Sequence, residues 1–224
     1  GTRRVEKFED GERTLWIKRP ETLKGLMRLL TGDPKTAFQA EIAAHQDLLA
    51  KGVPVPPIVA VGSDYIVTED IGRTIRHQMN MAKTDKALLD RMLTDAARAL
   101  ARMHASGASH GRPNLKDIVW SAGEVGFLDF ERTGREADHA RAEEMDVLMF
   151  VFSTCAETHG SKDAMAVARD AYAAEAPETW QRAVRRHRRF RPLRFLLWPI
   201  VKLRPDKRDF AAIKPFFEFM GSGA

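Results

Sequence analysis

Residues 110–131 read HGRPNLKDIVWSAGEVGFLDFE and carry more information than any other segment of this chain. The first apolar run predicts a short strand, and the small residues Ser121–Glu124 predict a turn. A second apolar run begins at Val125 and predicts a strand that ends just before Asp129. Asp117 and Asp129 therefore flank one hairpin, and we expect the two carboxylates to meet at its end.

The composition is that of a folded protein with one compact domain or two small lobes. The 224 residues are 44% hydrophobic, which suffices for a buried core and excludes a chain that is disordered throughout. The single cysteine, Cys155, excludes an internal disulfide framework and favours a reducing compartment. Because Cys155 lies in an apolar stretch, we expect it to be buried packing rather than a reactive thiol. We find no signal peptide and no apolar run long enough to span a bilayer, which favours the cytoplasm.

Positive charge is concentrated near the C-terminus. The net charge is +5, yet residues 181–209 hold eleven Lys or Arg against two Asp, so the rest of the chain is mildly acidic. This asymmetry indicates contact with an anionic partner. The short apolar run at residues 195–201 beside these arginines suits a membrane surface with anionic lipid. The alternative is a helix that packs its apolar side on the protein and leaves its arginines in water. Nucleic acid is disfavoured, because the aromatic residues are not spaced among the basic ones.

The order of predicted elements is that of an α+β protein with two lobes. Strand pairs are predicted within residues 4–19, around the turn Asp10-Gly11, and between residues 58–61 and 65–68. Helices are predicted at residues 36–51, 86–105, 137–155 and 164–174. We therefore place a small β-rich N-lobe in residues 1–70 and a helical C-lobe, with the basic segment, in residues 71–224. The segment Glu69–Gly72 is the expected hinge between them.

These features resemble the bacterial protein-kinase-like family that includes lipopolysaccharide-core kinases, small-molecule phosphotransferases and toluene-tolerance proteins. The resemblance runs from about Trp16 to Phe150. It rests on the loop that begins at His110, on Asp129 before Phe130, and on the lysine that ends a predicted strand, Lys18. It implies a two-lobe kinase-like fold that uses ATP and magnesium as cofactors.

The resemblance assigns candidate roles to residues that lie far apart in the sequence. Lys18 resembles the strand lysine that contacts the nucleotide phosphates, and Glu41 resembles the helix glutamate that pairs with this lysine and keeps it aimed at phosphate oxygens. Glu69, at the start of the expected hinge, is a candidate for nucleotide binding. Asp129 resembles the principal magnesium ligand. Asp117 stands where many kinases have a metal-binding asparagine, and its charge suits a hard cation.

Three further residues have roles that the resemblance implies. His110 is expected to brace the loop that it opens, rather than to act as a general base. Glu131 replaces the glycine usual in the family and either contacts metal or holds the loop. Asp146 resembles a buried helix aspartate that braces the same loop; alternatively it is a carboxylate in the first turn of a helix, favoured by the helix dipole. Plainer interpretations also stay open, with Lys18 as an exposed lysine at a strand end and the two hairpin aspartates as turn-flanking residues.

The chain departs from the family at Arg112 and before Lys18. Where the family has an aspartate that orients or deprotonates the acceptor hydroxyl, this chain has Arg112, which cannot act as a base near neutral pH. The guanidinium can clamp a phosphate or an anionic acceptor, or it can pair with Asp117 or Asp129 and block metal binding. No Gly-x-Gly-x-x-Gly motif precedes Lys18.

Three functions are compatible with these observations. The first is an atypical ATP-dependent phosphotransferase, whose acceptor is lipid-linked or envelope-related, a small molecule or a protein, with transfer of AMP as a variant. The second is a pseudokinase that serves as a nucleotide-binding or membrane-surface scaffold, which Arg112 and the missing glycine motif favour. The third is a membrane adaptor that works through its basic segment. The combination of Lys18, Glu41, Asp117 and Asp129 favours the first. We therefore predict a cytoplasmic phosphotransferase that associates peripherally with the inner face of the membrane.

Overall fold

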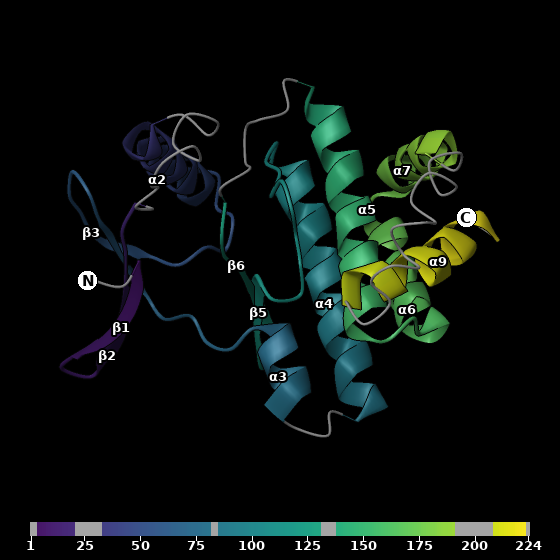
Figure 1. The fold of residues 1–224 in the computed structure, drawn as a ribbon, viewed down its shortest axis with the longest axis horizontal. Helices are drawn as coiled ribbons and strands as arrows, with labels where there is room; N and C mark the ends of the chain where they lie inside the picture. The colour runs from purple at the N-terminus through teal and green to yellow at the C-terminus, as the bar shows by residue number, and fades with distance from the viewer. Residues whose placement is uncertain (1–3, 21–32, 82–84, 131–137, 191–207, 223–224) are drawn as a thin grey trace.

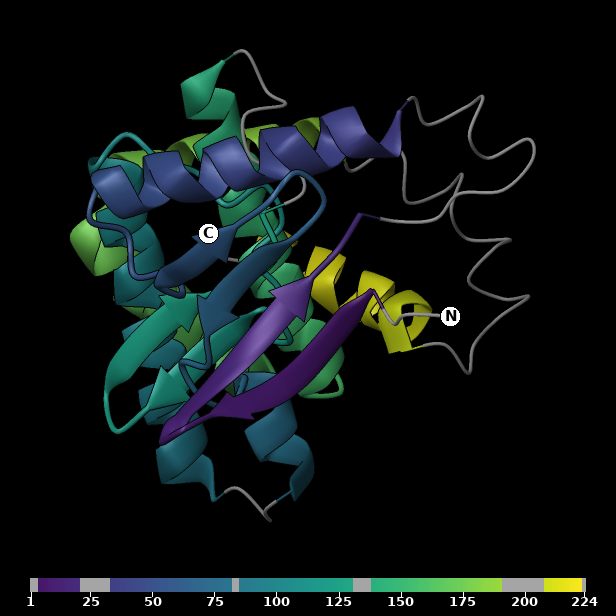
Figure 2. The same cartoon turned by 90° about the vertical axis from the view of Figure 1, so that its left-hand side faces the viewer.

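Four antiparallel strands and one helix form the N-lobe of the computed structural model, which describes residues 4–20, 33–81, 85–130, 138–190 and 208–222. The strands are β1 (Val5–Asp10), β2 (Arg13–Lys18), β3 (Ile58–Val61) and β4 (Ile66–Glu69), and they lie in the order β1-β2-β4-β3. The helix α2 (Pro34–Ala50) connects β2 to β3 in the chain and lies beside the sheet (Figure 1; Figure 2). The predicted strand pairs at residues 4–19 and 58–68 and the helix at residues 36–51 are confirmed.

Helix α2 is held to the sheet by a small apolar cluster on the sheet face from which Lys18 projects. Phe38 and Ile42 of α2 pack with Ile66 of β4. In the register of β2 with β4, Lys18 lies directly opposite Ile66. Residues directly opposite each other project from the same face of a sheet. Lys18 therefore projects from the face that α2 covers, which is the geometry needed to reach Glu41.

In the described part of the C-lobe, the regular elements are helices and one hairpin. They are α3 (Ile75–Met81), α4 (Lys86–Ala105), β5 (Ile118–Ser121), β6 (Glu124–Phe127), α5 (His139–Glu157), α6 (Lys162–Glu175), α7 (Pro177–Phe190) and α9 (Arg208–Gly221). Helices α4 and α5 run side by side through this lobe, and the β5–β6 hairpin lies between them and the N-lobe sheet (Figure 1). The core of the lobe includes Leu93 and Leu100 of α4, which are fully buried as the stripe of apolar residues in that helix predicts. The prediction of an α+β protein is confirmed.

Several boundaries differ from those predicted, and two elements were not foreseen. Helix α5 begins at His139 and ends at Glu157, two residues later at each end than expected. Asp138 sets the start of the helix, because it caps the N-terminus by accepting the Arg141 backbone N–H. The short helix α3 and the C-terminal helix α9 were not predicted, and α7 begins before the arginine-rich part of its sequence. Glu131 and the apolar run at residues 195–201 lie outside the described residues. The division of the chain at residues 70 and 71 stays a prediction.

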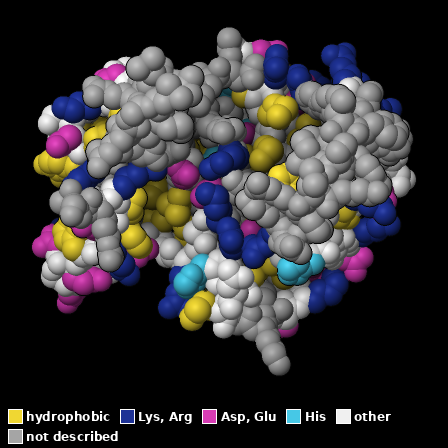
Figure 3. Space-filling model, viewed as in Figure 1, with side chains coloured by type: hydrophobic (Ala, Val, Ile, Leu, Met, Phe, Trp, Pro, Cys, Tyr) yellow, Lys and Arg dark blue, Asp and Glu magenta, His cyan; other side chains and the backbone are white. Residues whose placement is uncertain are grey.

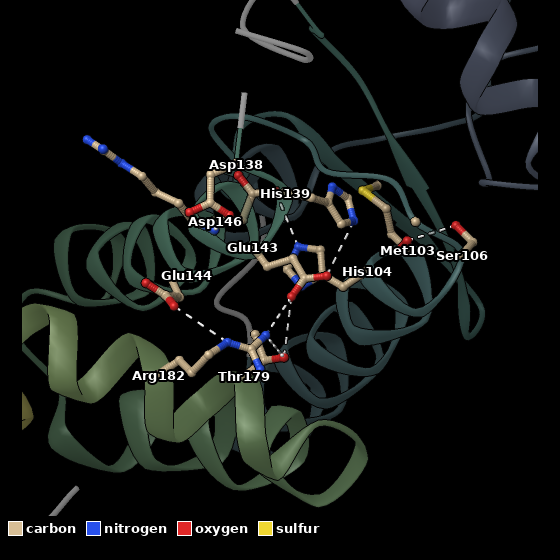
Figure 4. Close-up of polar contacts among 12 residues, drawn as sticks. Met103, His104, Ser106, Asp138, His139, Glu143, Glu144, Asp146, Thr179 and Arg182 are labelled. Carbon is tan, nitrogen blue, oxygen red and sulfur yellow. Dashed lines mark hydrogen bonds and ion pairs between the residues drawn. The ribbon is translucent and has the colours of Figure 1, made fainter. Parts of the chain in front are cut away.

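The described part of the basic segment is anchored to the C-lobe by ion pairs. Arg182 of α7 donates to Glu143 of α5 at 2.8 Å (Figure 4), and Arg186 pairs with Glu144. On the outer side of α7, Arg185, Arg188 and Arg189 are exposed. Within the described ranges, no helix is long and apolar enough to cross a membrane.

Candidate active site

The β5–β6 hairpin brings Asp117 and Asp129 to the same end, as the sequence predicted. Asp117 directly precedes β5, and Asp129 follows the end of β6 by two residues. Between them, the Leu128 backbone N–H donates to the Asp117 carbonyl oxygen at 2.8 Å. The hairpin thus fixes the backbone of both aspartates relative to each other.

Asp129 has an unusual backbone and two cationic partners. Its φ is 63°, in the left-handed region that non-glycine residues adopt at a cost in energy. One carboxylate oxygen, Oδ1, lies 3.4 Å from the Lys18 ammonium, and the other, Oδ2, lies 3.8 Å from the Arg112 guanidinium. Strain of this kind persists where the surrounding structure holds a side chain in place, which makes Asp129 a candidate functional residue.

Lys18 joins the two lobes. Its ammonium forms an ion pair with Glu41 of α2 and a second, weaker one with Asp129, which is 111 positions away in the chain. All three side chains are partly shielded from solvent, so the attraction is screened less than at an open surface. A group of Lys and Arg side chains with acidic neighbours is visible between the two lobes in the space-filling view (Figure 3). The predicted pair of Lys18 and Glu41 is therefore formed in the structure.

Arg112 lies in a tight turn whose backbone is held locally. The preceding residue, Gly111, has a φ of 87°. The Arg112 backbone N–H points to Nδ1 of His110 at 3.4 Å, and its carbonyl oxygen accepts from the Asn114 backbone N–H at 2.9 Å. Of the possibilities that the sequence left open for Arg112, the structure shows an ion pair with Asp129.

Asp117 is more deeply buried than Asp129. Burial raises the pKa of the Asp117 carboxyl, while the neighbouring Lys116 ammonium and a hydrogen bond from the Asn114 side chain act in the opposite direction. The Lys116 ammonium lies 3.4 Å from one carboxylate oxygen, and the Asn114 amide lies 3.3 Å from the other. Asp117 thus has its own local partners, distinct from those of Asp129.

Asp146 braces the loop that carries Arg112. This fully buried carboxylate accepts the backbone N–H groups of His110 at 2.6 Å and of Gly111 at 2.8 Å. It also lies 3.3 Å from Nε2 of His104, whose other ring nitrogen is 2.6 Å from the Tyr172 hydroxyl; His104 and Asp146 are among the residues drawn in Figure 4. Because α5 begins at His139, Asp146 is beyond the first turn, so the helix-dipole alternative is wrong.

His110 is part of the apolar support beneath the hairpin. Its ring is fully buried and lies against the rings of Phe127 and Phe130, with centroid distances of 5.8 and 5.2 Å. Burial lowers the pKa of His110, so the ring is favoured in its neutral form. This surrounding fits a residue that holds the loop rather than one that exchanges protons with solvent.

Glu69 lies apart from the charges around Asp129. It ends β4, and its carboxylate is 3.7 Å from the Arg13 guanidinium on the neighbouring strand. It lines a depression of about 480 Å³ together with hinge residues that include Asp70 and Gly72. The structure therefore places Glu69 beside the hinge but does not join it to the Lys18–Asp129 cluster.

Sequence reasoning missed Trp16. Side chains alternate along a strand, so Trp16 projects from the same sheet face as Lys18, two residues later. The Trp16 side chain is 37% exposed, and the Lys7 ammonium lies 5.9 Å from its ring centroid. The signal that could have found Trp16 was its position two residues before Lys18, which places it on the sheet face that carries the charge cluster.

Two carboxylates at one end of a hairpin fit a magnesium ion that also binds substrate phosphates. Magnesium is usually held by one or two carboxylates together with phosphate oxygens and water, rather than by a complete protein cage. The described residues contain no group of three or more His, Cys, Asp or Glu side chains placed to hold a metal. Asp117 and Asp129 are the residues here whose carboxylates could supply hard oxygen ligands to such a shared site.

Comparison with known proteins identifies the family. The model of the lipopolysaccharide kinase (Kdo/WaaP) family matches residues 2–172. The chain belongs to this family. A protein of Haemophilus influenzae (strain ATCC 51907 / DSM 11121 / KW20 / Rd), described as uncharacterized, is 30% identical over 216 residues, which are 96% of this chain and 88% of that protein.

Two solved structures show the same fold at low sequence identity. The bifunctional protein WbdD, in complex with the kinase inhibitor LY294002, matches with a TM-score of 0.50 and 14% identity over 79% of this chain and 44% of that chain. The chain thus spans less than half the length of WbdD. APH(2")-IIa in complex with gentamicin matches with a TM-score of 0.50 and 11% identity, over 98% of this chain and 88% of that chain. The predicted two-lobe kinase-like fold is confirmed.

Proposed function

We propose that this protein binds magnesium and ATP between the N-lobe sheet and the β5–β6 hairpin and transfers the terminal phosphoryl group to an envelope-related acceptor. The observation that carries this proposal is the position of Lys18, held between Glu41 and Asp129. A lysine in that position is held by one carboxylate and lies beside a second carboxylate that could bind a metal ion. Membership of a family of lipopolysaccharide kinases supports phosphoryl transfer as the reaction.

Each charged residue then has a distinct task in the proposed site. Lys18 orients the nucleotide phosphates, and Glu41 keeps the ammonium in place. Asp129 and Asp117 would hold a magnesium ion. The bound ion would neutralise negative charge on the phosphate oxygens. Trp16, on the same sheet face as Lys18, offers a flat aromatic surface for the nucleotide base.

The absence of an aspartate at position 112 is compatible with transfer. Phosphoryl transfer depends mainly on positioning and on stabilising negative charge, because its transition state is loose and involves little bonding to the attacking oxygen. Arg112 cannot remove a proton, but it adds positive charge beside Asp129. We therefore expect slow transfer that depends on electrostatics more than on a general base.

The acceptor we propose is a hydroxyl group on an anionic, lipid-linked sugar at the inner face of the membrane. The family's name supports a lipopolysaccharide-type acceptor. Arg185, Arg188 and Arg189, which are exposed on α7, support attraction to an anionic surface. The association with the membrane that we propose is peripheral, because positively charged side chains attract anionic lipids at the surface without crossing the bilayer.

A second candidate function is favoured by one observation. In the structure Arg112 pairs with the proposed metal ligand Asp129, as expected of a pseudokinase that binds nucleotide without turnover. Such a protein would keep the contacts of Lys18 with the nucleotide phosphates but would neither hydrolyse ATP nor transfer its phosphate.

Thermal unfolding with ATP, with and without magnesium, tests the proposed nucleotide site. At a ligand concentration 100 times Kd, binding adds about 2.7 kcal/mol of stability, which corresponds to a rise in Tm of about 5–10 °C for a chain of this size. We expect that rise to need magnesium and to be lost in Asp129→Ala and in Lys18→Ala. Asp170→Ala, which removes an exposed aspartate from α6, is the matched control and should retain the magnesium-dependent rise in Tm.

The outcomes separate the two candidates and can reject both. A natural protein whose Tm does not change at saturating ATP and magnesium would contradict a nucleotide site. A magnesium-dependent rise, followed by transfer of labelled phosphate from ATP to a lipopolysaccharide extract, would support the phosphotransferase. The same rise without hydrolysis or transfer would support the pseudokinase.

A further inference from the structure

We propose that Arg112 is a charge latch: it neutralises Asp129 while the site is empty, and the terminal phosphate of the nucleotide draws it away and frees the carboxylate for the metal. This inference rests on the proposed nucleotide site and specifies how that site is kept closed to metal alone. It gives a role to the residue that stands where the family has an acidic one.

Both oxygens of the Asp129 carboxylate face a cation. Lys18 lies 3.4 Å from Oδ1, and Arg112 lies 3.8 Å from Oδ2. A divalent cation that binds Asp129 must compete with these two positive charges for the same oxygens. The affinity of the nucleotide-free protein for a divalent cation is therefore lower than two neighbouring carboxylates would otherwise give.

The two cations are not held equally. Lys18 has a second and closer carboxylate partner in Glu41, so its position does not depend on Asp129. The ion pair between Arg112 and Asp129 is longer than a hydrogen bond, and the Arg112 side chain is 36% exposed. Arg112 is consequently the partner that can leave while Lys18 stays.

Release requires only a movement of the Arg112 side chain. The backbone around it is fixed, because the carboxylate of Asp146 accepts the N–H groups of His110 and Gly111. The Arg112 carbonyl oxygen also accepts the Asn114 N–H. The guanidinium can therefore rotate between Asp129 and a nearby phosphate without refolding of the loop.

A phosphate is a better partner for this guanidinium than the carboxylate it faces. Arginine presents parallel N–H donors that match two phosphate oxygens, and such charge-assisted pairs are strong when bidentate. The contact with Asp129 at 3.8 Å is not of that kind. When Arg112 leaves Asp129 for a phosphate, it gains a partner that its paired N–H donors fit better. The same movement removes a competing positive charge from the carboxylate that would bind the metal.

If Arg112 is a charge latch, Arg112→Ala should change metal affinity and nucleotide affinity in opposite directions. In the nucleotide-free protein, Arg112→Ala should tighten binding of Mn²⁺, measured by electron paramagnetic resonance of the free ion, about two- to fivefold, which is the range that a partly exposed ion pair allows. With magnesium present, the same variant should bind a non-hydrolysable ATP analogue about tenfold more weakly, because a charged contact with the terminal phosphate is lost. Its affinity for ADP should change little.

Two variants control for charge and for position. Arg112→Lys keeps the positive charge, so Mn²⁺ should bind as weakly as to the natural protein, while the loss of the paired donors still weakens the ATP analogue. Arg98→Ala removes an arginine from α4 that pairs with Glu175 of α6, and it should alter neither affinity.

Each result decides between specific alternatives. Mn²⁺ affinity that is unchanged or lower in Arg112→Ala would overturn the latch, whether or not nucleotide binds. Equal losses of affinity for ADP and for the ATP analogue would overturn the contact with the terminal phosphate. Failure of the natural protein to bind either nucleotide would reject the proposed function and the phosphate half of the latch together, while tighter Mn²⁺ binding in Arg112→Ala would still support the blocking half.

Discussion

Asp146 is the residue whose replacement should most disturb the candidate site without touching it. Asp146→Ala removes the acceptor of two backbone N–H groups, those of His110 and Gly111, in a fully buried position. A hydrogen bond to a charged group contributes about 1.5–3 kcal/mol, so two of them lost together should cost about 3–5 kcal/mol of unfolding free energy. Asp146→Asn keeps one acceptor oxygen but turns an amide toward the other donor, so about 1.5–3 kcal/mol should be lost. Against a total stability of about 5–15 kcal/mol, either change is large.

Urea unfolding followed by circular dichroism measures these losses. The matched control is Asp138→Ala in the same helix, because Asp138 caps the N-terminus of α5 through a single exposed contact at 3.3 Å and should cost about 1 kcal/mol. The reasoning is refuted if Asp146→Ala costs no more than Asp138→Ala. Should Asp146→Ala fail to fold, the comparison of Asp146→Asn with the control decides the same question.

Two further predictions concern buried titratable groups. Burial lowers the pKa of His110 below its ordinary value of 6.5, so below that pH the unfolded state binds more protons than the folded state, and the unfolding free energy should fall as pH decreases. His110→Gln should reduce that slope between pH 4.5 and 6.5, as urea titrations on the pH series would show; an unchanged slope would contradict the assignment. Burial also raises the pKa of Cys155 to about 11, so at pH 8 iodoacetamide should alkylate the folded protein far more slowly than the urea-unfolded chain. Similar labelling rates in the two states, followed by mass spectrometry, would show that the thiol is reactive.

The elements that the sequence predicted well are those with local causes. The turn at Gly11, whose φ is 63°, joins β1 to β2 as the Asp-Gly pair predicted. Helix α4 occupies the predicted residues 86–105 because its apolar residues recur at helical spacing and Asp85 caps its first turn. Helix α3 was missed because its seven residues include one buried apolar side chain, Ile75, which is too little for a periodic pattern.

The candidate site could be predicted in its members but not in its contacts. Asp117 and Asp129 share a hairpin, so their proximity follows from local pairing. The contact between Lys18 and Asp129 depends on how the two lobes pack, which no local pattern encodes. The same holds for Arg112, for which the sequence allowed several partners, and for Glu69, whose side chain turns to Arg13 instead of the charge cluster.

The separation between Lys18 and Asp129 also has a consequence for synthesis of the protein. Ribosomes add about 5–20 residues per second, so the 111 positions between these residues correspond to roughly 6–22 s of translation. During that interval the sheet and α2 can form and pair Lys18 with Glu41, while the carboxylate that completes the cluster does not yet exist. The contact of Lys18 with Asp129, and any ligand that binds through both residues, can therefore stabilise the N-lobe only after the β5–β6 hairpin has been made.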